Sequence, residues 1–305
     1  MQLTRPMLFG ATALALFAVL FTWYFYRFAL DIGGAVPVAR EEQVLDTASL
    51  RKPVVYVSVI SRYPPNVISS GYQPMLDYMT HRSPYRFELK LCAEYGQAVD
   101  MLLRGEVAAA FLGSYLYITA RRDHGVLPIL KPLNSTGAPF SRSALFTSTS
   151  SDIHDIRALR GRRLALPSEE SYSANWLLRR VFARYGMGVG DLAAVAHFPH
   201  HQRVIQQVTG GAFDAGVTRE HLLGNIRDRS VRVLLYSEPF PTSPIVVART
   251  HDTSITQAIR DVLLSLPRDA RARAAVTRGW DHEFVHGFVE AHDADYDVVR
   301  EIVDR

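Results

Sequence analysis

The sequence of 305 residues contains a single cysteine, Cys92, and no long run of one charge. One cysteine excludes an internal disulfide framework and a cysteine metal cluster. Charged residues make up only 21% of the chain, and its net charge of +4 comes from arginines that are spread over many segments. A nucleic-acid-binding protein usually concentrates such an excess on one face, so we expect no nucleic-acid partner.

Common catalytic motifs are also missing from the sequence. It has no Gly-x-Ser-x-Gly elbow, no P-loop and no dinucleotide fingerprint. No nucleophile stands at a recognisable spacing from a general base. The sequence therefore favours a binding protein over an enzyme, and we expect no cofactor.

One short match to an enzyme motif is present near the C-terminus. The segment His282-Glu283-Phe284-Val285-His286 has the zincin pattern, in which two histidines bind zinc and the glutamate acts as a base. Zincins carry this pattern on a long apolar helix, whereas Gly287 follows it directly here. A zinc-dependent hydrolase using His282, Glu283 and His286 is therefore a disfavoured alternative, and we expect no metal site.

The chain has one long apolar run, Met7 to Tyr26, without a charged residue. About 20 helical residues extend about 30 Å, the thickness of a bilayer core. We expect residues 1–30 to form an uncleaved, single-pass anchor in the cytoplasmic membrane and residues 31–50 to form a linker. A cleaved signal peptide is the alternative, with a weak cleavage site at Gly33-Gly34-Ala35. In both cases the remainder is exported to the periplasmic or extracellular side.

From residue 51 onwards, strand-like and helix-like segments alternate. We expect strands at Val54–Ile60, Phe87–Cys92, Val107–Leu112, Ser143–Thr147, Arg163–Leu166, Ala193–Phe198, Ala212–Val217, Val231–Tyr236 and Ile245–Ala248. We expect a helix to open at Pro74, others at 96–103, 115–122, 155–159, 174–185 and 203–208, and mostly helix after residue 256. This alternation predicts parallel βαβ units in two α/β halves with a cleft between them.

Three hydroxyl side chains, Ser171-Tyr172-Ser173, lie between a predicted strand and a predicted helix. The free N–H groups and the dipole at a helix N-terminus favour an anion, and hydroxyls add donors. This arrangement predicts a pocket for a small tetrahedral oxyanion. The simpler alternative is that serine only caps the helix.

Several motifs in order along the chain resemble the periplasmic phosphate/phosphite/phosphonate-binding proteins of ABC transporters. They are Gly71–Met79, Glu94–Tyr95, Gly105–Ser114, Leu159–Leu166, Ser171–Ala174, His201, Gly211–Gly216, Gly287–Phe288 and Tyr296–Asp297. The resemblance runs from about Val54 to the C-terminus. It implies an α/β, two-lobed type II periplasmic binding-protein fold. Lobe 1 would comprise residues 51–139 and 241–305, and lobe 2 residues 140–240.

The resemblance also implies a set of ligand-binding residues. Tyr95 would donate its hydroxyl from the first lobe, Ser171, Tyr172 and Ser173 would hold the oxyanion, and His201 would donate a ring N–H. Tyr172 replaces the family's threonine. Ser243 stands where aminophosphonate binders have an acid, which argues against a ligand amine there. His197 and His200 lie near His201, but we favour a single histidine lining the cleft over a metal site.

Together these features predict a membrane-tethered, extracytoplasmic solute-binding protein for phosphate, phosphite or a phosphonate. Its lobes would close by a hinge near Pro139–Phe140 and Phe240–Pro241. The partner would be an ABC permease or a membrane sensor kinase. A non-transport envelope scaffold with a degenerate binding-protein fold is the main alternative.

Overall fold

The computed structural model describes residues 19–20, 47–224 and 230–304 of the chain. Apart from Val19 and Leu20, the expected anchor lies outside the described residues, as does most of the expected linker. In the part that is described, no helix is both long and apolar enough to cross a membrane. Leu45–Arg305 forms one compact unit, and the fold below is that of this unit.

The first lobe is built on a six-stranded sheet with the strand order β13-β4-β12-β3-β1-β2. Strand β1 pairs in parallel with β2 and β3, whereas β12 and β13 run antiparallel to their neighbours. Its strands are β1 (Val54–Val59), β2 (Arg86–Leu91), β3 (Ala109–Phe111), β4 (Leu127–Pro132), β12 (Ile245–Val247) and β13 (Phe288–Glu290). Its helices include α3 (Pro65–Arg82), α4 (Gln97–Leu103), α5 (Ser114–His124), α10 (Thr253–Leu264) and α11 (Ala270–Val276), and the short α2 (Thr47–Leu50) precedes β1.

The second lobe is built on a five-stranded sheet with the strand order β10-β6-β9-β7-β8. Here β7 pairs in parallel with β8 and β9, and β6 runs antiparallel to β9 and β10. Its strands are β6 (Ser143–Ser148), β7 (Arg163–Leu166), β8 (Ala194–His197), β9 (Ala215–Arg219) and β10 (Val231–Tyr236). Its helical segments are η3 (Ile156–Leu159), α6 (Tyr172–Asn175), η4 (Trp176–Val181), α7 (Phe182–Arg184), η5 (Val189–Asp191), α8 (His201–Thr209) and α9 (Glu220–Leu223).

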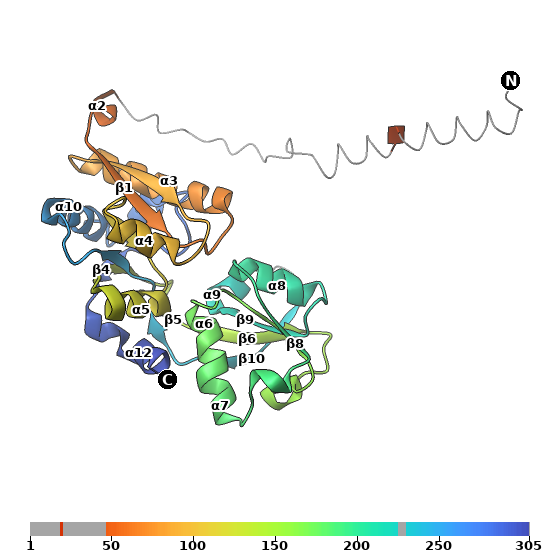
Figure 1. Cartoon of the computed structure of the whole chain (residues 1–305). Helices are drawn as coiled ribbons and strands as arrows, with labels where there is room; N and C mark the ends of the chain where they lie inside the picture. The colour runs from red at the N-terminus through yellow and green to blue at the C-terminus, as the bar shows by residue number, and fades with distance from the viewer. Residues whose placement is uncertain (1–18, 21–46, 225–229, 305) are drawn as a thin grey trace, which may run out of the picture. The chain divides into compact units, whose positions relative to one another are not determined.

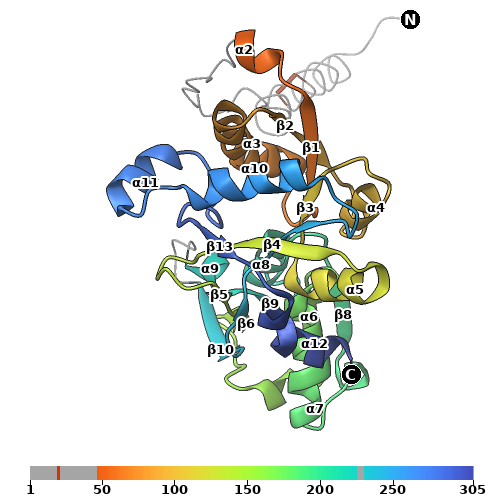
Figure 2. The same cartoon turned by 90° about the vertical axis from the view of Figure 1, so that its left-hand side faces the viewer.

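The chain passes between the lobes along two short paired strands (Figures 1 and 2). β5 (Phe140–Ser141) leads into the second lobe and β11 (Phe240–Pro241) leads out of it, and the two pair antiparallel. These are the segments at which the sequence predicts a hinge. The two-lobed α/β fold expected from the sequence is therefore confirmed, although both sheets are mixed and not purely parallel.

An apolar cluster connects the lobes on the side of the C-terminus. Helix α12 (Asp297–Val303), which follows η6 (Asp293–Tyr296), contacts α5 as well as α6 and η4. The rings of Tyr117 and Tyr296 meet edge to face at 4.8 Å, and Trp176 and Ile302 belong to the same buried cluster. This packing holds the lobes against each other on one side of the cleft.

The first helix differs from the one expected. Pro64 is its N-cap and Pro65 is its first residue, so Pro74 lies inside the helix and not in its first turn. A proline at the first helical position loses nothing, whereas Pro74 removes an internal backbone hydrogen bond. Burial of Tyr72, Met75 and Leu76 against the sheet offsets that loss and keeps the helix continuous.

Candidate functional site

A pocket lies between the lobes, where strands of both sheets end. Its volume is about 390 Å³, including its open mouth. Arg62 follows β1, Tyr95 follows β2, and His201 follows β8, while Arg219 is the last residue of β9. Ligands of open α/β sheets bind at the carboxyl ends of strands, so this position is the expected one. The lining residues are Ile60, Arg62, Tyr63, Tyr95, Gly113, Ser114, Glu170, Ser171, Tyr172, Ser173, His201, Arg219 and Leu222.

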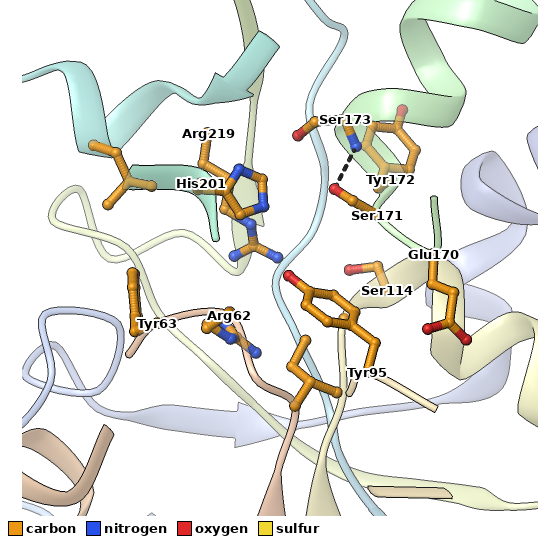
Figure 3. A pocket seen from close by; sticks show the side chains of 13 residues that line it. Arg62, Tyr63, Tyr95, Ser114, Glu170, Ser171, Tyr172, Ser173, His201 and Arg219 are labelled. Carbon is orange, nitrogen blue, oxygen red and sulfur yellow. Dashed lines mark hydrogen bonds between the residues drawn. The ribbon is translucent and has the colours of Figure 1, made fainter. Parts of the chain in front are cut away.

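All five residues predicted from the sequence to bind a ligand line this pocket. Ser171 comes after β7 and is the N-cap of a helix that continues without a break through α6, η4 and α7. Its Oγ accepts a hydrogen bond from the backbone N–H of Ser173 at 3.2 Å, so the helix cap exists. Ser171 is also a pocket residue (Figure 3), so capping and ligand contact do not exclude each other at this position.

The hydroxyls of the three-residue cluster point in different directions. Ser173 Oγ lies 2.7 Å from Ser143 Oγ, inside the second lobe. The Tyr172 ring stacks on Phe240 with ring centroids 3.8 Å apart, and its hydroxyl points away from the centre of the pocket (Figure 3). Tyr172 therefore presents its ring and backbone here, and not its hydroxyl.

Tyr95 and His201 face the pocket from opposite lobes (Figure 3). Burial raises the pKa of Tyr95, so its hydroxyl stays protonated and can donate. Burial, together with the charges of Arg219 and Arg62, lowers the pKa of His201 well below its usual value. His201 is therefore neutral at pH 7. Its Nδ1 lies 3.2 Å from Thr218 Oγ1, which leaves Nε2 for a ligand.

Two buried arginines share one carboxylate at this pocket. Arg62 Nη1 donates to Glu283 Oε2, and Arg219 Nη1 donates to Glu283 Oε1 at 2.6 Å. The other terminal nitrogen of Arg219 donates to Ser243 Oγ at 2.7 Å. Arg62, Glu283 and Ser243 belong to the first lobe and Arg219 to the second, so these contacts tie the lobes together. Sequence reasoning assigned no pocket role to either arginine.

Further polar contacts cross between the lobes near the pocket. His200 Nδ1 lies 2.9 Å from the Ser61 carbonyl oxygen, and the carboxylate of Glu170 lies beside Gly96 of the first lobe. Burial raises the pKa of Glu170. Hydrogen bonds between the lobes therefore flank the pocket on more than one side.

The zincin-like segment has a structural role. Residues 282–286 form turns and not a helix, so the two histidines do not lie one helical turn apart. The Glu283 carboxylate, which would be the base, is held by Arg62 and Arg219. Across the described ranges, no cluster of three or more metal-ligating side chains could hold an ion. The hydrolase alternative is therefore wrong.

The three neighbouring histidines contact three different protein groups. His197 Nδ1 lies 2.7 Å from the Pro167 carbonyl oxygen, whereas His200 and His201 contact Ser61 and Thr218. Each ring is oriented by a different protein group.

The pKa of Glu283 predicts how the free energy of unfolding depends on pH. Burial alone would raise its pKa, but Arg62 and Arg219 lower it to about 2 from 4.5. A carboxylate with a lowered pKa stabilises the fold fully above its unfolded pKa of about 4.5 and loses that contribution as the pH falls toward 2. Urea unfolding of wild type and Glu283→Gln should show a difference in free energy that shrinks by about 3 kcal/mol between pH 5 and pH 2. A constant difference over this range would contradict the assignment.

Comparisons with known proteins agree with this fold. The family model described as "ABC transporter, phosphonate, periplasmic substrate-binding protein" matches residues 57–296. The resemblance inferred from the sequence motifs is therefore confirmed.

Solved structures share the fold at low sequence identity. A binding protein component of an ABC phosphonate transporter from Pseudomonas aeruginosa is 17% identical, with a TM-score of 0.73 over 82% of this chain and 85% of that one. PhnD1 from Prochlorococcus marinus, in complex with methylphosphonate, is 16% identical, with a TM-score of 0.71 over 82% and 96%. XAC2383 from Xanthomonas citri, bound to chloride, is 21% identical, with a TM-score of 0.66 over 82% and 96%.

Proposed function

Because the chain belongs to the periplasmic substrate-binding proteins of ABC phosphonate transporters, we propose that it captures a small phosphonate or a related oxyanion outside the cytoplasm. The family is one of binding proteins and not of enzymes, in agreement with the missing catalytic motifs. Phosphate and phosphite are the related oxyanions that we include.

The observation that carries this proposal is the convergence of donors in the pocket between the lobes. The N-terminus of the helix that begins at Tyr172, the hydroxyl of Tyr95 and the free nitrogen of His201 all face a buried space. A small anion in a closed cleft needs several such donors and little water. The methylphosphonate complex of the Prochlorococcus protein, which has the same fold, supports this class of ligand.

The partner and the location follow from the same proposal. We infer that residues 1–30 anchor the protein to the cytoplasmic membrane, on the basis of the uncharged run from Met7 to Tyr26. The compact unit that contains the pocket would then lie on the outer side of that membrane. Closure would present a surface to an ABC permease that takes up the ligand, or to a membrane sensor kinase that reads occupancy.

Titration of the full-length protein in a mild detergent tests this function. Calorimetry would compare methylphosphonate, phosphate, phosphite and sulfate, with the folded state checked by circular dichroism. We expect a dissociation constant in the micromolar range or below for at least one of the phosphorus oxyanions. Absence of binding by the folded protein across the panel would contradict the proposal and favour an envelope scaffold.

A further inference from the structure

The side chain of Arg62 carries hydrogen-bond donors that nothing in the described chain uses. Its exposed fraction is only 4%, and it extends into the pocket from the first lobe (Figure 3). Nη1 donates to Glu283, but Nε and Nη2 are buried and have no hydrogen-bond partner among the described residues. Buried donors of a charged group are costly when unpaired, so their presence in a ligand pocket points to a ligand acceptor.

The two free donors have a specific geometry. A guanidinium is planar, and its Nε–H and one terminal N–H project from the same edge. Such an edge donates two parallel hydrogen bonds to the two oxygens of a carboxylate. Because Nη1 is occupied by Glu283, the free edge of Arg62 is the one formed by Nε and Nη2.

The charges around this edge favour an additional negative group. Glu283 uses one oxygen for each arginine, and Arg219 uses its remaining terminal nitrogen on Ser243. His201 is neutral, so Arg62 and Arg219 carry two positive charges against the one negative charge of Glu283. Asp281 also lies near Arg62, but burial raises the pKa of Asp281, which favours its neutral form. Glu170 also lines the pocket, but its carboxylate points away from Arg62 (Figure 3). An ammonium group beside Arg62 would be repelled, whereas a carboxylate would be attracted.

We propose that Arg62 is a specificity-determining residue for a second anionic group, so that the preferred ligand is a small phosphonate that also carries a carboxylate. This inference rests on the function proposed above. The phosphonate binds at the N-terminus of the helix that begins at Tyr172, and the carboxylate binds the free edge of Arg62. The ligand therefore bridges the lobes, as the Arg219–Glu283 contact already does.

The test compares three probes on the full-length protein in detergent. Methylphosphonate has one anionic group, phosphonoacetate adds a carboxylate, and 2-aminoethylphosphonate adds an ammonium group. Calorimetry should show phosphonoacetate binding about tenfold or more tighter than methylphosphonate, as expected for added hydrogen bonds between charged groups. 2-Aminoethylphosphonate should bind more weakly than both.

Variants assign this preference to Arg62. Arg62→Met should weaken phosphonoacetate binding about ten- to a hundredfold and methylphosphonate binding much less. Arg62→Lys keeps the charge but lacks the two-donor edge, so it should lose part of the preference. Arg122→Met is the matched control, because Arg122 is an exposed arginine paired with Asp123, and it should leave both affinities at the wild-type level.

The outcomes separate this inference from the function on which it rests. Equal binding of methylphosphonate and phosphonoacetate, or an equal loss of both in Arg62→Met, would overturn the role of Arg62 while the proposed function stands. If no probe binds to the folded wild type, both are overturned. If Arg62→Met does not fold, the ratio of the two affinities in Arg62→Lys decides, and an unchanged ratio would overturn the inference.

Discussion

Replacing Glu283 with alanine should lower the free energy of unfolding by about 3–5 kcal/mol, the range seen when one partner of a buried ion pair is removed. The side chains of Arg62, Arg219 and Glu283 are 4%, 10% and 6% exposed, so water cannot replace the lost carboxylate. Alanine would leave two buried guanidinium groups without their shared counter-charge. Urea unfolding at pH 7 measures the loss, and a fall in melting temperature of about 10 °C should accompany it.

Glu290 offers a matched control for this experiment. It lies in the same part of the chain, but its side chain is 51% exposed and its pair with Arg260 is 3.7 Å long. Glu290→Ala should therefore change the free energy of unfolding by less than about 1 kcal/mol. If Glu283→Ala cost no more than Glu290→Ala, the carboxylate would not hold the lobes together.

Substituting Ser171 or His201 with alanine should strongly weaken anion binding. Ser171→Ala removes a hydroxyl at the helix N-terminus that faces the pocket, and His201→Ala removes the free ring nitrogen. Each change should weaken binding of the tightest anion in the panel by about tenfold or more, since each deletes a hydrogen bond to a charged group. Calorimetric titration of the two variants beside wild type measures this effect.

The loss of the helix cap in Ser171→Ala requires its own control. Ser171 accepts from the Ser173 N–H, and Asp252 caps α10 in the same way by accepting from the N–H groups of Ser254 and Ile255. Either substitution by alanine should cost about 1 kcal/mol of stability. Only Ser171→Ala should also lose affinity, and an equal loss of affinity in Asp252→Ala would show that destabilisation, not ligand contact, is responsible.

Local patterns in the sequence were sufficient to predict the framework of the fold. Buried runs such as Val54–Ile60 and Arg163–Leu166 become strands, and the hydroxyl cluster at Ser171 does begin a helix. Each of these features depends on residues that are neighbours in the sequence, so it can be predicted from the sequence alone. Pro74 shows the limit, because tertiary burial keeps it within a helix that propensity alone would have started there.

The charged centre of the pocket could not be predicted in the same way. Glu283 lies 221 positions after Arg62 and 64 positions after Arg219, and only the folded lobes bring the three together. A partial signal existed, since Arg62 and Arg219 each follow a predicted strand, where ligands of α/β sheets bind. The zincin-like motif at residues 282–286 is a local pattern, whereas the two arginines that contact the Glu283 carboxylate are distant from it in sequence.

A crystal structure of the protein grown with methylphosphonate tests the central claim most directly. We predict that the phosphonate group lies at the N-terminus of the helix that begins at Tyr172, within hydrogen-bond distance of Ser171, Tyr95 and His201 Nε2. A folded protein whose cleft holds no phosphonate at saturating concentration, or holds it away from these side chains, would contradict the account.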